Sequence, residues 1–346
     1  MRKILHNRWF QWEMTLAILV VLGFVFRDEL DFLTEGFRRL RHTSPLPVGV
    51  VILASLTSLA AMAEVMRLLL GAGDVRVSPK ETTAITLASN ALSTTLPAGP
   101  AFSAVLTFHV QRQWGAPTVL CGWFLVLSSA LSTMWMVLIG LAAVLFLNAD
   151  MSMWSLLLSL TVTLSVAWAV FWVTSHPRTI ERVVARQKWL GDKRDGLIAH
   201  VRNLREVHLS RPAFISAAAY SLLHRVADMA ALWACVWAVT GEIPWLSASD
   251  DHTTLAGVAL AFITAKLAGS AQVTPAGLGT VEAAIIATLV ACGMTAVDAT
   301  SAAFVYRLIS FALMTLNGWV VYFWHYARKG MTFSTLNLKR KDTGSV

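Results

Sequence analysis

The sequence predicts an all-α polytopic membrane protein, built as an inverted-topology repeat with two re-entrant (broken) helical hairpins. Only 14% of the 346 residues are charged and 56% are hydrophobic, whereas a soluble domain carries about 25% charged residues. Several apolar runs reach or approach the roughly 20 residues that cross a bilayer core. Two further apolar regions are interrupted by proline and glycine. Together these observations exclude a water-soluble protein.

The uninterrupted apolar runs are the predicted membrane spans. They cover residues 10–26, 46–70, 117–147, 152–174, 212–240 and 300–327. Lys3 and Arg8 precede the first run, and no small-residue cleavage site follows it, so we expect a retained helix rather than a signal peptide. Tryptophans near the ends of the runs are typical of interfacial belts; they are Trp9, Trp12, Trp114, Trp154, Trp319 and Trp324.

Lysine and arginine predict the orientation, because cytoplasmic loops carry an excess of them. Residues 175–211 contain nine basic residues against four acidic ones, and residues 328–346 are also basic. The loop 241–253 contains three acidic residues and no lysine or arginine. We therefore expect a bacterial plasma (inner) membrane protein with both termini in the cytoplasm and loop 241–253 outside.

Residues 82–110 and 254–292 are the interrupted regions, and counting crossings makes each begin and end on one side of the membrane. The first enters from the cytoplasm and the second from outside. LPAGPAFSAV, from Leu96 to Val105, lines up with TPAGLGTVEA, from Thr274 to Ala283. Inverted repeats with broken helices form binding sites near the bilayer midplane. The tips predicted to approach each other there contain Pro97, Gly99 and Pro100, and Pro275, Gly277 and Gly279.

Five segments follow from this organisation. They are an N-terminal span with an external loop (1–45), a first membrane repeat with a linking span (46–174), a basic cytoplasmic linker (175–211), a second, inverted repeat (212–327) and a basic cytoplasmic tail (328–346). Basic and apolar residues alternate over 179–208, which favours a helix along the anionic inner leaflet, with a solvated linker helix as the alternative.

The broken regions resemble a known family. TPAGLGTVEAAIIATLVACGMTAVDATSAAFVYRLISF resembles the C-terminal signature of the lysylphosphatidylglycerol synthase/flippase transmembrane-domain family. The residues that match are Pro275, Gly277, Leu278, Gly279, Glu282, Gly293, Tyr306 and Arg307. ASNALSTTLPAGPAFSAVLTFHVQRQWG is similar to the first-half motif, and its matching residues are Asn90, Pro97, Gly99 and Pro100. The likeness covers residues 45–327 and implies a membrane module that moves or binds an anionic or polyprenyl-phosphate-linked lipid.

The chain departs from the family at two places. Ala98 and Pro100-Ala101 stand where many members carry Arg and Gly-Glu, so the first half lacks the family's charged residues. Fewer than 20 residues follow the last predicted span, which leaves no room there for the soluble aminoacyl-transferase domain of some members. We therefore expect no lysyl-lipid synthesis and no enzymatic activity.

Charged groups at membrane depth are costly and mark functional sites by default. The candidates are Glu64 with Arg67, Arg225 with Asp228, Lys266, Glu282 and Arg307. The first two pairs have i,i+3 spacing, so each can pair on one helix face. For Glu64 and Arg67, near a span end, the structural interpretation is favoured. For Arg225 and Asp228, structure and function both stay open.

Glu282 follows the Gly279 break, where a carboxylate complements the positive end of a helix dipole. The alternative is a gating or proton-coupled carboxylate paired with Lys266 or Arg307. We predict Arg307 within reach of Glu282, with Lys266 facing the same cavity. Backbone N–H groups at 276–280 are suited to a phosphate. Through the resemblance, Tyr306 and Asn90 join this predicted transport site.

Other motifs point to no further chemistry. The sequence contains no Walker loop, HExxH or GxSxG motif, and we expect no cofactor and no metal. The three cysteines match no metal or redox spacing, and His109 and His224 are expected to serve packing or hydrogen bonding. The net charge of +8 lies in loops between spans, which argues against nucleic acid as a partner.

The leading hypothesis is therefore a lipid flippase-like protein that translocates or binds an anionic phospholipid or a polyprenyl-phosphate-linked lipid. Two alternatives stay open, namely a secondary transporter of a small anionic solute and a non-catalytic partner of an envelope-lipid transferase. The expected partners are membrane lipids, with a second copy of the chain or a lipid-synthesis enzyme as further candidates.

Overall fold

The computed structural model describes residues 45–96, 99–147, 161, 165, 210–247, 251–270 and 277–326. All regular elements among these residues are helices. Four stretches are long and apolar enough to cross a membrane, at Pro45–Gly71, Thr118–Ala143, Arg211–Thr240 and Ala296–Tyr326. An all-α protein with several membrane spans is thus confirmed. The predicted span 10–26, most of 152–174, most of the linker 175–211 and the tail 328–346 lie outside the described residues.

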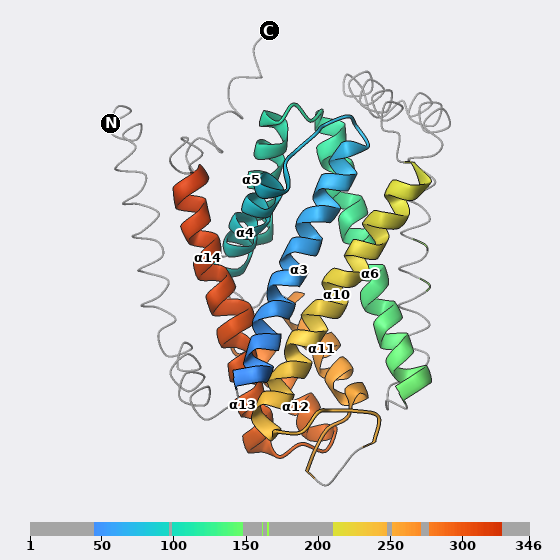
Figure 1. Cartoon of the computed structure of the whole chain (residues 1–346), viewed down its shortest axis with the longest axis vertical. Helices are drawn as coiled ribbons and strands as arrows, with labels where there is room; N and C mark the ends of the chain where they lie inside the picture. Colours follow the sequence, from blue (N-terminus) through green and yellow to red (C-terminus); the bar gives the residue numbers. More distant parts are fainter. Residues whose placement is uncertain are drawn as a thin grey trace, which may run out of the picture.

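Helices α3 (Pro45–Gly71) and α10 (Arg211–Thr240) form the centre of the molecule and run in opposite directions (Figure 1). They contact each other more extensively than any other pair of described helices. Their buried positions are dominated by small residues, which let two helix backbones approach closely; these include Ala54, Ser55, Ser58, Ala61, Ala217, Ser221, Ala227 and Ala231. Close packing of two spans therefore follows from residue size.

Helices α4 (Pro79–Thr95) and α5 (Gly99–Gln113) occupy the first interrupted region and lie in the upper part of Figure 1. Ser78 and Glu81 form a capping box at the start of α4. Leu96 is extended, as expected of a residue before proline, and it ends the helix. A Cβ on Gly99 would overlap the carbonyl oxygen of Ser93. The close turn between the two helices therefore requires glycine.

Helices α11 (Leu255–Ser270) and α12 (Thr280–Ala291) occupy the second interrupted region and lie in the lower part of Figure 1. Gly277 and Gly279 adopt φ angles of +62° and +81°, which residues with a Cβ rarely adopt. At 1.5 Å per residue, α4, α5, α11 and α12 are about 18 to 26 Å long, shorter than the bilayer core of about 30 Å. Each helix alone is therefore too short to cross it upright.

The last span alternates between α-helical and π-helical segments: α13 (Ala296–Tyr306), η5 (Arg307–Leu313), α14 (Met314–Val321) and η6 (Tyr322–Tyr326). Nothing in the sequence predicted the π-helical turns, which are rare and often occur at functional sites. The span packs against α4, and α6 (Thr118–Leu147) packs against α11.

Trp319 corrects the predicted interfacial belt. Its side chain is buried, and its Nε1 donates a hydrogen bond of 3.2 Å to Oγ1 of Thr95 on α4. Trp324, one turn further on, is 69% exposed and keeps the position expected of a belt residue. Trp319 is buried and Trp324 is exposed because they lie on different faces of the helix. The apolar run in the sequence does not show which face is buried.

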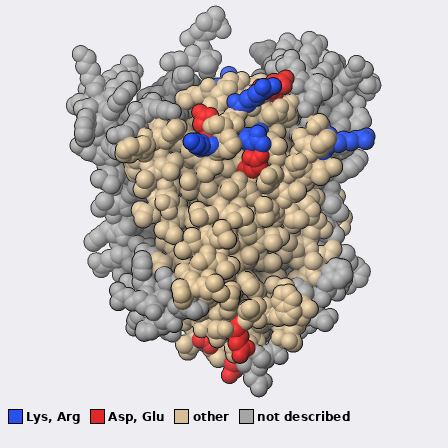
Figure 2. All heavy atoms as spheres, in the orientation of Figure 1, with Lys and Arg blue, Asp and Glu red and all other residues tan. Residues whose placement is uncertain are grey.

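On the face shown in Figure 2, the charged side chains gather towards the two ends of the molecule and leave an uncharged band between them. One end, around the start of α4, the end of α5 and the start of α10, holds Asp74, Arg76, Lys80, Glu81, Arg112 and Arg211. The described residues at the other end include Glu242, Asp251 and Asp298 and no lysine or arginine. One end of the molecule therefore carries charges of both signs with an excess of basic residues, and the other end is acidic.

Candidate functional site

A cavity of about 490 Å³ lies among α3, α4, α10, α11, α12 and the last span, and we call it the central cavity. Ser58 is the middle residue of α3, and Arg225 lies midway along α10. Both residues line the cavity and are about 20 Å of helix from either end of their spans. The polar and charged lining residues are Ser55, Ser58, Thr86, Asn90, Ser93, Thr94, His224, Arg225, Asp228, Lys266, Tyr306, Arg307 and Ser310.

Glu282 and Arg307 form a buried ion pair at this cavity. Nε of Arg307 donates to Oε1 of Glu282 at 2.6 Å, and their side chains are 6% and 9% exposed. Glu282 lies in the first turn of α12, where it also complements the helix dipole. The guanidinium of Arg307 stacks over the ring of Phe311 at 4.3 Å. The predicted contact is therefore present and links α12 to the last span.

Asp228 and Lys266 form a second ion pair, which links α10 to α11. Oδ2 of Asp228 and Nζ of Lys266 are 2.6 Å apart, and both residues line the cavity. This corrects the sequence expectation, which paired Asp228 with Arg225 along one helix face. The helix spacing permits that pairing, but α11 brings a lysine closer to the carboxylate.

Arg225 is the remaining cation of the cavity. It donates a hydrogen bond to the hydroxyl of Ser132 on α6, and its Nε is buried without a hydrogen-bond partner. No ion pair joins it to a carboxylate among the described residues. Because Lys266 and Arg307 each have a carboxylate partner, the three cations outnumber the two carboxylates by one. The described part of the site therefore carries one positive charge in excess.

The wall contributed by α3 and α4 contains no charged side chain, and its polar groups are hydroxyl and amide groups beside the apolar Leu59 and Met62. Ser55, Ser58, Asn90, Ser93 and Thr94 belong to it. Ser58 hydrogen-bonds Nδ1 of His224 at 2.9 Å across to α10, and Oγ of buried Ser55 has no partner in the described chain. Sequence reasoning found Asn90 but missed the serines; the i,i+3 spacing of Ser55 and Ser58 on an apolar span is the signal that marks them.

The other predicted site residues fall into three groups. Tyr306 lines the cavity with Arg307. Gly99, Pro100, Gly277 and Gly279 are at the helix breaks, while Pro97 and Pro275 lie outside the described residues. The helix turns that precede the breaks meet at one place, because Asn90, Ser93 and Thr94 of α4 and Gly269 of α11 line the same cavity. Whether the tips themselves touch stays a prediction.

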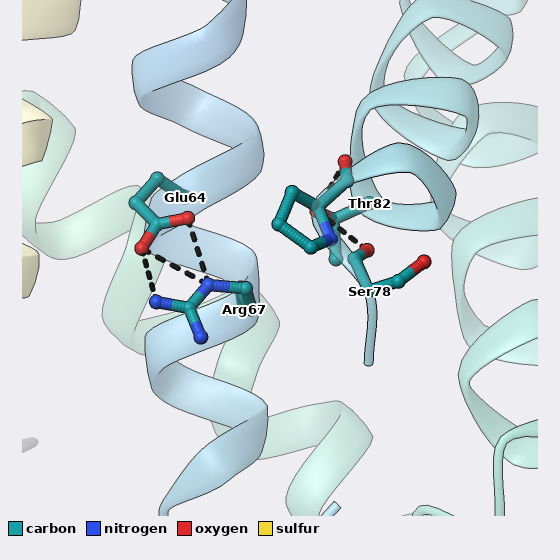
Figure 3. A network of polar contacts seen from close by, with 5 residues as sticks. Glu64, Arg67, Ser78 and Thr82 are labelled. Carbon is teal, nitrogen blue, oxygen red and sulfur yellow. Dashed lines mark hydrogen bonds and ion pairs between the residues drawn. The ribbon is translucent and has the colours of Figure 1, made fainter. Parts of the chain in front are cut away.

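Glu64 and Arg67 lie outside this constellation. Figure 3 shows the two side chains together on α3, where Nε of Arg67 donates to both carboxylate oxygens at 2.8 and 3.0 Å. Neither residue lines the cavity, and Arg67 is 39% exposed. The predicted i,i+3 pair is therefore present, and it offers a matched control for the charges of the cavity.

Comparison with known families gives one result that covers this site. The family model described as the lysylphosphatidylglycerol synthase TM region matches residues 14–318. No curated protein matches the chain. The matched range contains α3 to α13, both short helix pairs and every residue that lines the central cavity.

Proposed function

The chain belongs to the lysylphosphatidylglycerol synthase transmembrane-region family, and on this premise we propose that it is a flippase-like membrane protein. This family is associated with lipid handling in membranes. The proposed cargo is an anionic phospholipid or a polyprenyl-phosphate-linked lipid, which moves between leaflets without chemical change. The central cavity is the proposed headgroup site.

Arg225 in the central cavity carries this proposal. A guanidinium presents a rigid fork of donors that matches phosphate oxygens, and charge-assisted hydrogen bonds of this kind are about twice as strong as neutral ones. Its Nε is buried without a hydrogen-bond partner among the described residues. A lipid phosphate in the cavity would supply acceptors to this group, and the hydroxyl and amide groups of α3 and α4 would contact the rest of the headgroup.

The cavity volume supports a headgroup rather than a whole lipid. About 490 Å³ is within the range of pockets that bind small molecules, roughly 300 to 1,000 Å³. Two acyl chains would exceed it and would stay in the surrounding bilayer. The outer faces of the spans suit that environment, because Leu53, Ile215 and Leu316 are more than 60% exposed there.

We propose further that the two short helix pairs are re-entrant hairpins of an inverted-topology repeat. In this scheme α3, α4, α5 and α6 correspond to α10, α11, α12 and the last span. The larger contacts between described elements then have counterparts: α4 packs against the last span as α11 packs against α6, and α3 contacts α4 as α10 contacts α11. Such pairing is expected of two halves with one architecture.

The charge distribution supports an orientation in the plasma (inner) membrane of a bacterium. The end with Arg76, Lys80, Arg112 and Arg211 is assigned to the cytoplasm, because basic residues concentrate there. The acidic end, with Glu242 and Asp251, is assigned to the outside. The α4/α5 hairpin then enters from the cytoplasm and the α11/α12 hairpin from outside.

Lipid transfer in proteoliposomes tests the proposed function. The purified chain is reconstituted with fluorescent phosphatidylglycerol, and a membrane-impermeant quencher reports the rate of exchange between leaflets. We expect transfer above that of protein-free liposomes and a loss of at least about tenfold in Arg225→Gln, since a charged hydrogen bond is lost. Glu64→Gln, outside the cavity, should leave the rate unchanged. Equal rates with and without the protein would overturn the proposal.

A further inference from the structure

We propose that the central cavity selects a lipid phosphodiester over a lipid phosphomonoester, an inference that rests on the proposed function. It narrows the cargo to phospholipids of the phosphatidylglycerol type or to polyprenyl phosphates that carry a sugar. Phosphatidic acid and bare polyprenyl phosphate, whose phosphate is a monoester, would be disfavoured. The number and arrangement of charges in the cavity favour the phosphodiester.

The cavity balances one negative charge. Among the described residues, Arg225, Lys266 and Arg307 are the cations of its lining. Asp228 of the lining pairs with Lys266, and Glu282, which is outside the lining, pairs with Arg307. A phosphodiester carries one negative charge, whereas a phosphomonoester carries about −1.5 to −2 at neutral pH. A phosphodiester beside Arg225 therefore leaves the site neutral, and a phosphomonoester leaves it negatively charged.

Because the charged side chains of the site are buried, the difference in net charge between the two bound lipids has a large effect on binding. The side chains of Arg307 and Glu282 are less than 10% exposed, and that of Asp228 is 15% exposed, so solvent screens them little. An unbalanced charge at membrane depth costs several kcal/mol. The two ion pairs also hold Asp228 in the cavity lining and Glu282 against Arg307 of that lining, so both carboxylates repel a second negative charge on the ligand.

Arg225 is the group through which the phosphate is recognised. Lys266 and Arg307 each already donate to a carboxylate oxygen at 2.6 Å. Arg225 instead donates to a neutral hydroxyl, that of Ser132, and keeps its buried Nε without a hydrogen-bond partner. It lines the cavity midway along α10. A ligand phosphate at this guanidinium would complete its hydrogen bonds without breaking either ion pair.

Substitutions that change the charge count test the proposal. Native mass spectrometry of the purified full chain measures retention of phosphatidylglycerol, the diester probe, and of phosphatidic acid, the monoester probe, at equal concentrations. Wild type should retain more phosphatidylglycerol. Asp228→Asn raises the excess to two positive charges and should shift the retention ratio towards phosphatidic acid by about tenfold, the effect of one buried charge contact.

Glu282→Gln changes the charge count in the same way from a different helix, so the test does not depend on the folding of one variant. Glu64→Gln also converts a paired carboxylate to an amide, but outside the cavity, and should leave the ratio as in wild type. If wild type retains neither lipid, the proposed headgroup site itself fails. If it retains both equally, or if the two cavity variants leave the ratio unchanged, charge selection is overturned while lipid binding stands.

Discussion

At the scale of single residues, the site depends on which cation each carboxylate meets. Asp228 meets Lys266 of α11, and Glu282 meets Arg307 of the last span. Both pairs join different helices, so each contributes to the position of a helix as well as to the charge of the cavity. Buried pairs of this kind seldom add much net stability, but the loss of one partner is strongly destabilising.

Replacing Arg307 tests its effect on lipid transfer separately from its effect on stability. Arg307→Ala should abolish lipid transfer and leave the protein folded, because the rest of the helix packing is untouched. It should also lower the free energy of unfolding by about 3 kcal/mol, since the buried Glu282 carboxylate loses its partner. Transfer in proteoliposomes and thermal unfolding in detergent measure the two effects.

The double variant Glu282→Gln/Arg307→Gln provides the control. It removes both charges, so it should recover most of the lost stability but none of the transfer. An Arg307→Ala variant with full transfer would contradict the assignment of Arg307 to the site.

At the scale of elements, the contact between α14 and α4 depends on Gly318. A Cβ at this position would overlap the carbonyl oxygen of Leu87 and approach Cβ of Ala91 at 2.8 Å. The same contact surface contains the hydrogen bond from Trp319 to Thr95 and that between Thr94 and Thr315. Small residues at such crossings let membrane helices pack without a hydrophobic driving force.

Gly318→Ala should therefore move α14 away from α4 and destabilise the protein by about 2 kcal/mol, the usual effect of overpacking. Gly122→Ala on α6 is the matched control, because its Cβ would meet nothing within 4 Å. Thermal unfolding of the two variants compares them directly. Equal midpoints for both would show that this contact tolerates a methyl group.

The elements themselves were largely predictable from the sequence, because proline and glycine interrupt apolar runs at the positions where the helices break. The observed spans begin and end within a few residues of the predicted ones for α3, α6, α10 and the last span. The partner of Asp228 and the burial of Trp319 were not predictable, since both depend on which helices become neighbours. The pairing of Arg307 with Glu282 was predictable, because the carboxylate follows a helix break and a cation lies in the next apolar run.

At the scale of the whole molecule, the two halves have corresponding contacts but different chemistry. The charged lining residues of the cavity belong to α10, α11 and the last span, all in the second half, whereas α3 and α4 contribute hydroxyl and amide groups. A headgroup would therefore meet a charged wall and a neutral wall, whichever side it enters from.

Cysteine labelling tests the proposed topology of the intact molecule. In a background without Cys121, Cys235 and Cys292, single cysteines at Ser78 and Trp114 should both react only from the cytoplasmic side. These positions flank the α4/α5 pair, and a re-entrant hairpin returns the chain to the side from which it came. A cysteine at Ile243 should react only from outside. Labelling of positions 78 and 114 from opposite sides would contradict both the hairpin and the inverted repeat.

The π-helical segment η5 makes the last span of this protein sensitive to the insertion or deletion of a single residue. In a regular α-helix, Arg307 and Gly318 are eleven residues apart and would lie within about 20° of each other around the axis. The wider turns of Arg307–Leu313 change that angle, so that Arg307 meets Glu282 while Gly318 meets α4. Gain or loss of a single codon here would alter which neighbours the two ends of the span contact. The hydropathy of the last span would hardly change, so its composition would give no sign of the insertion or deletion.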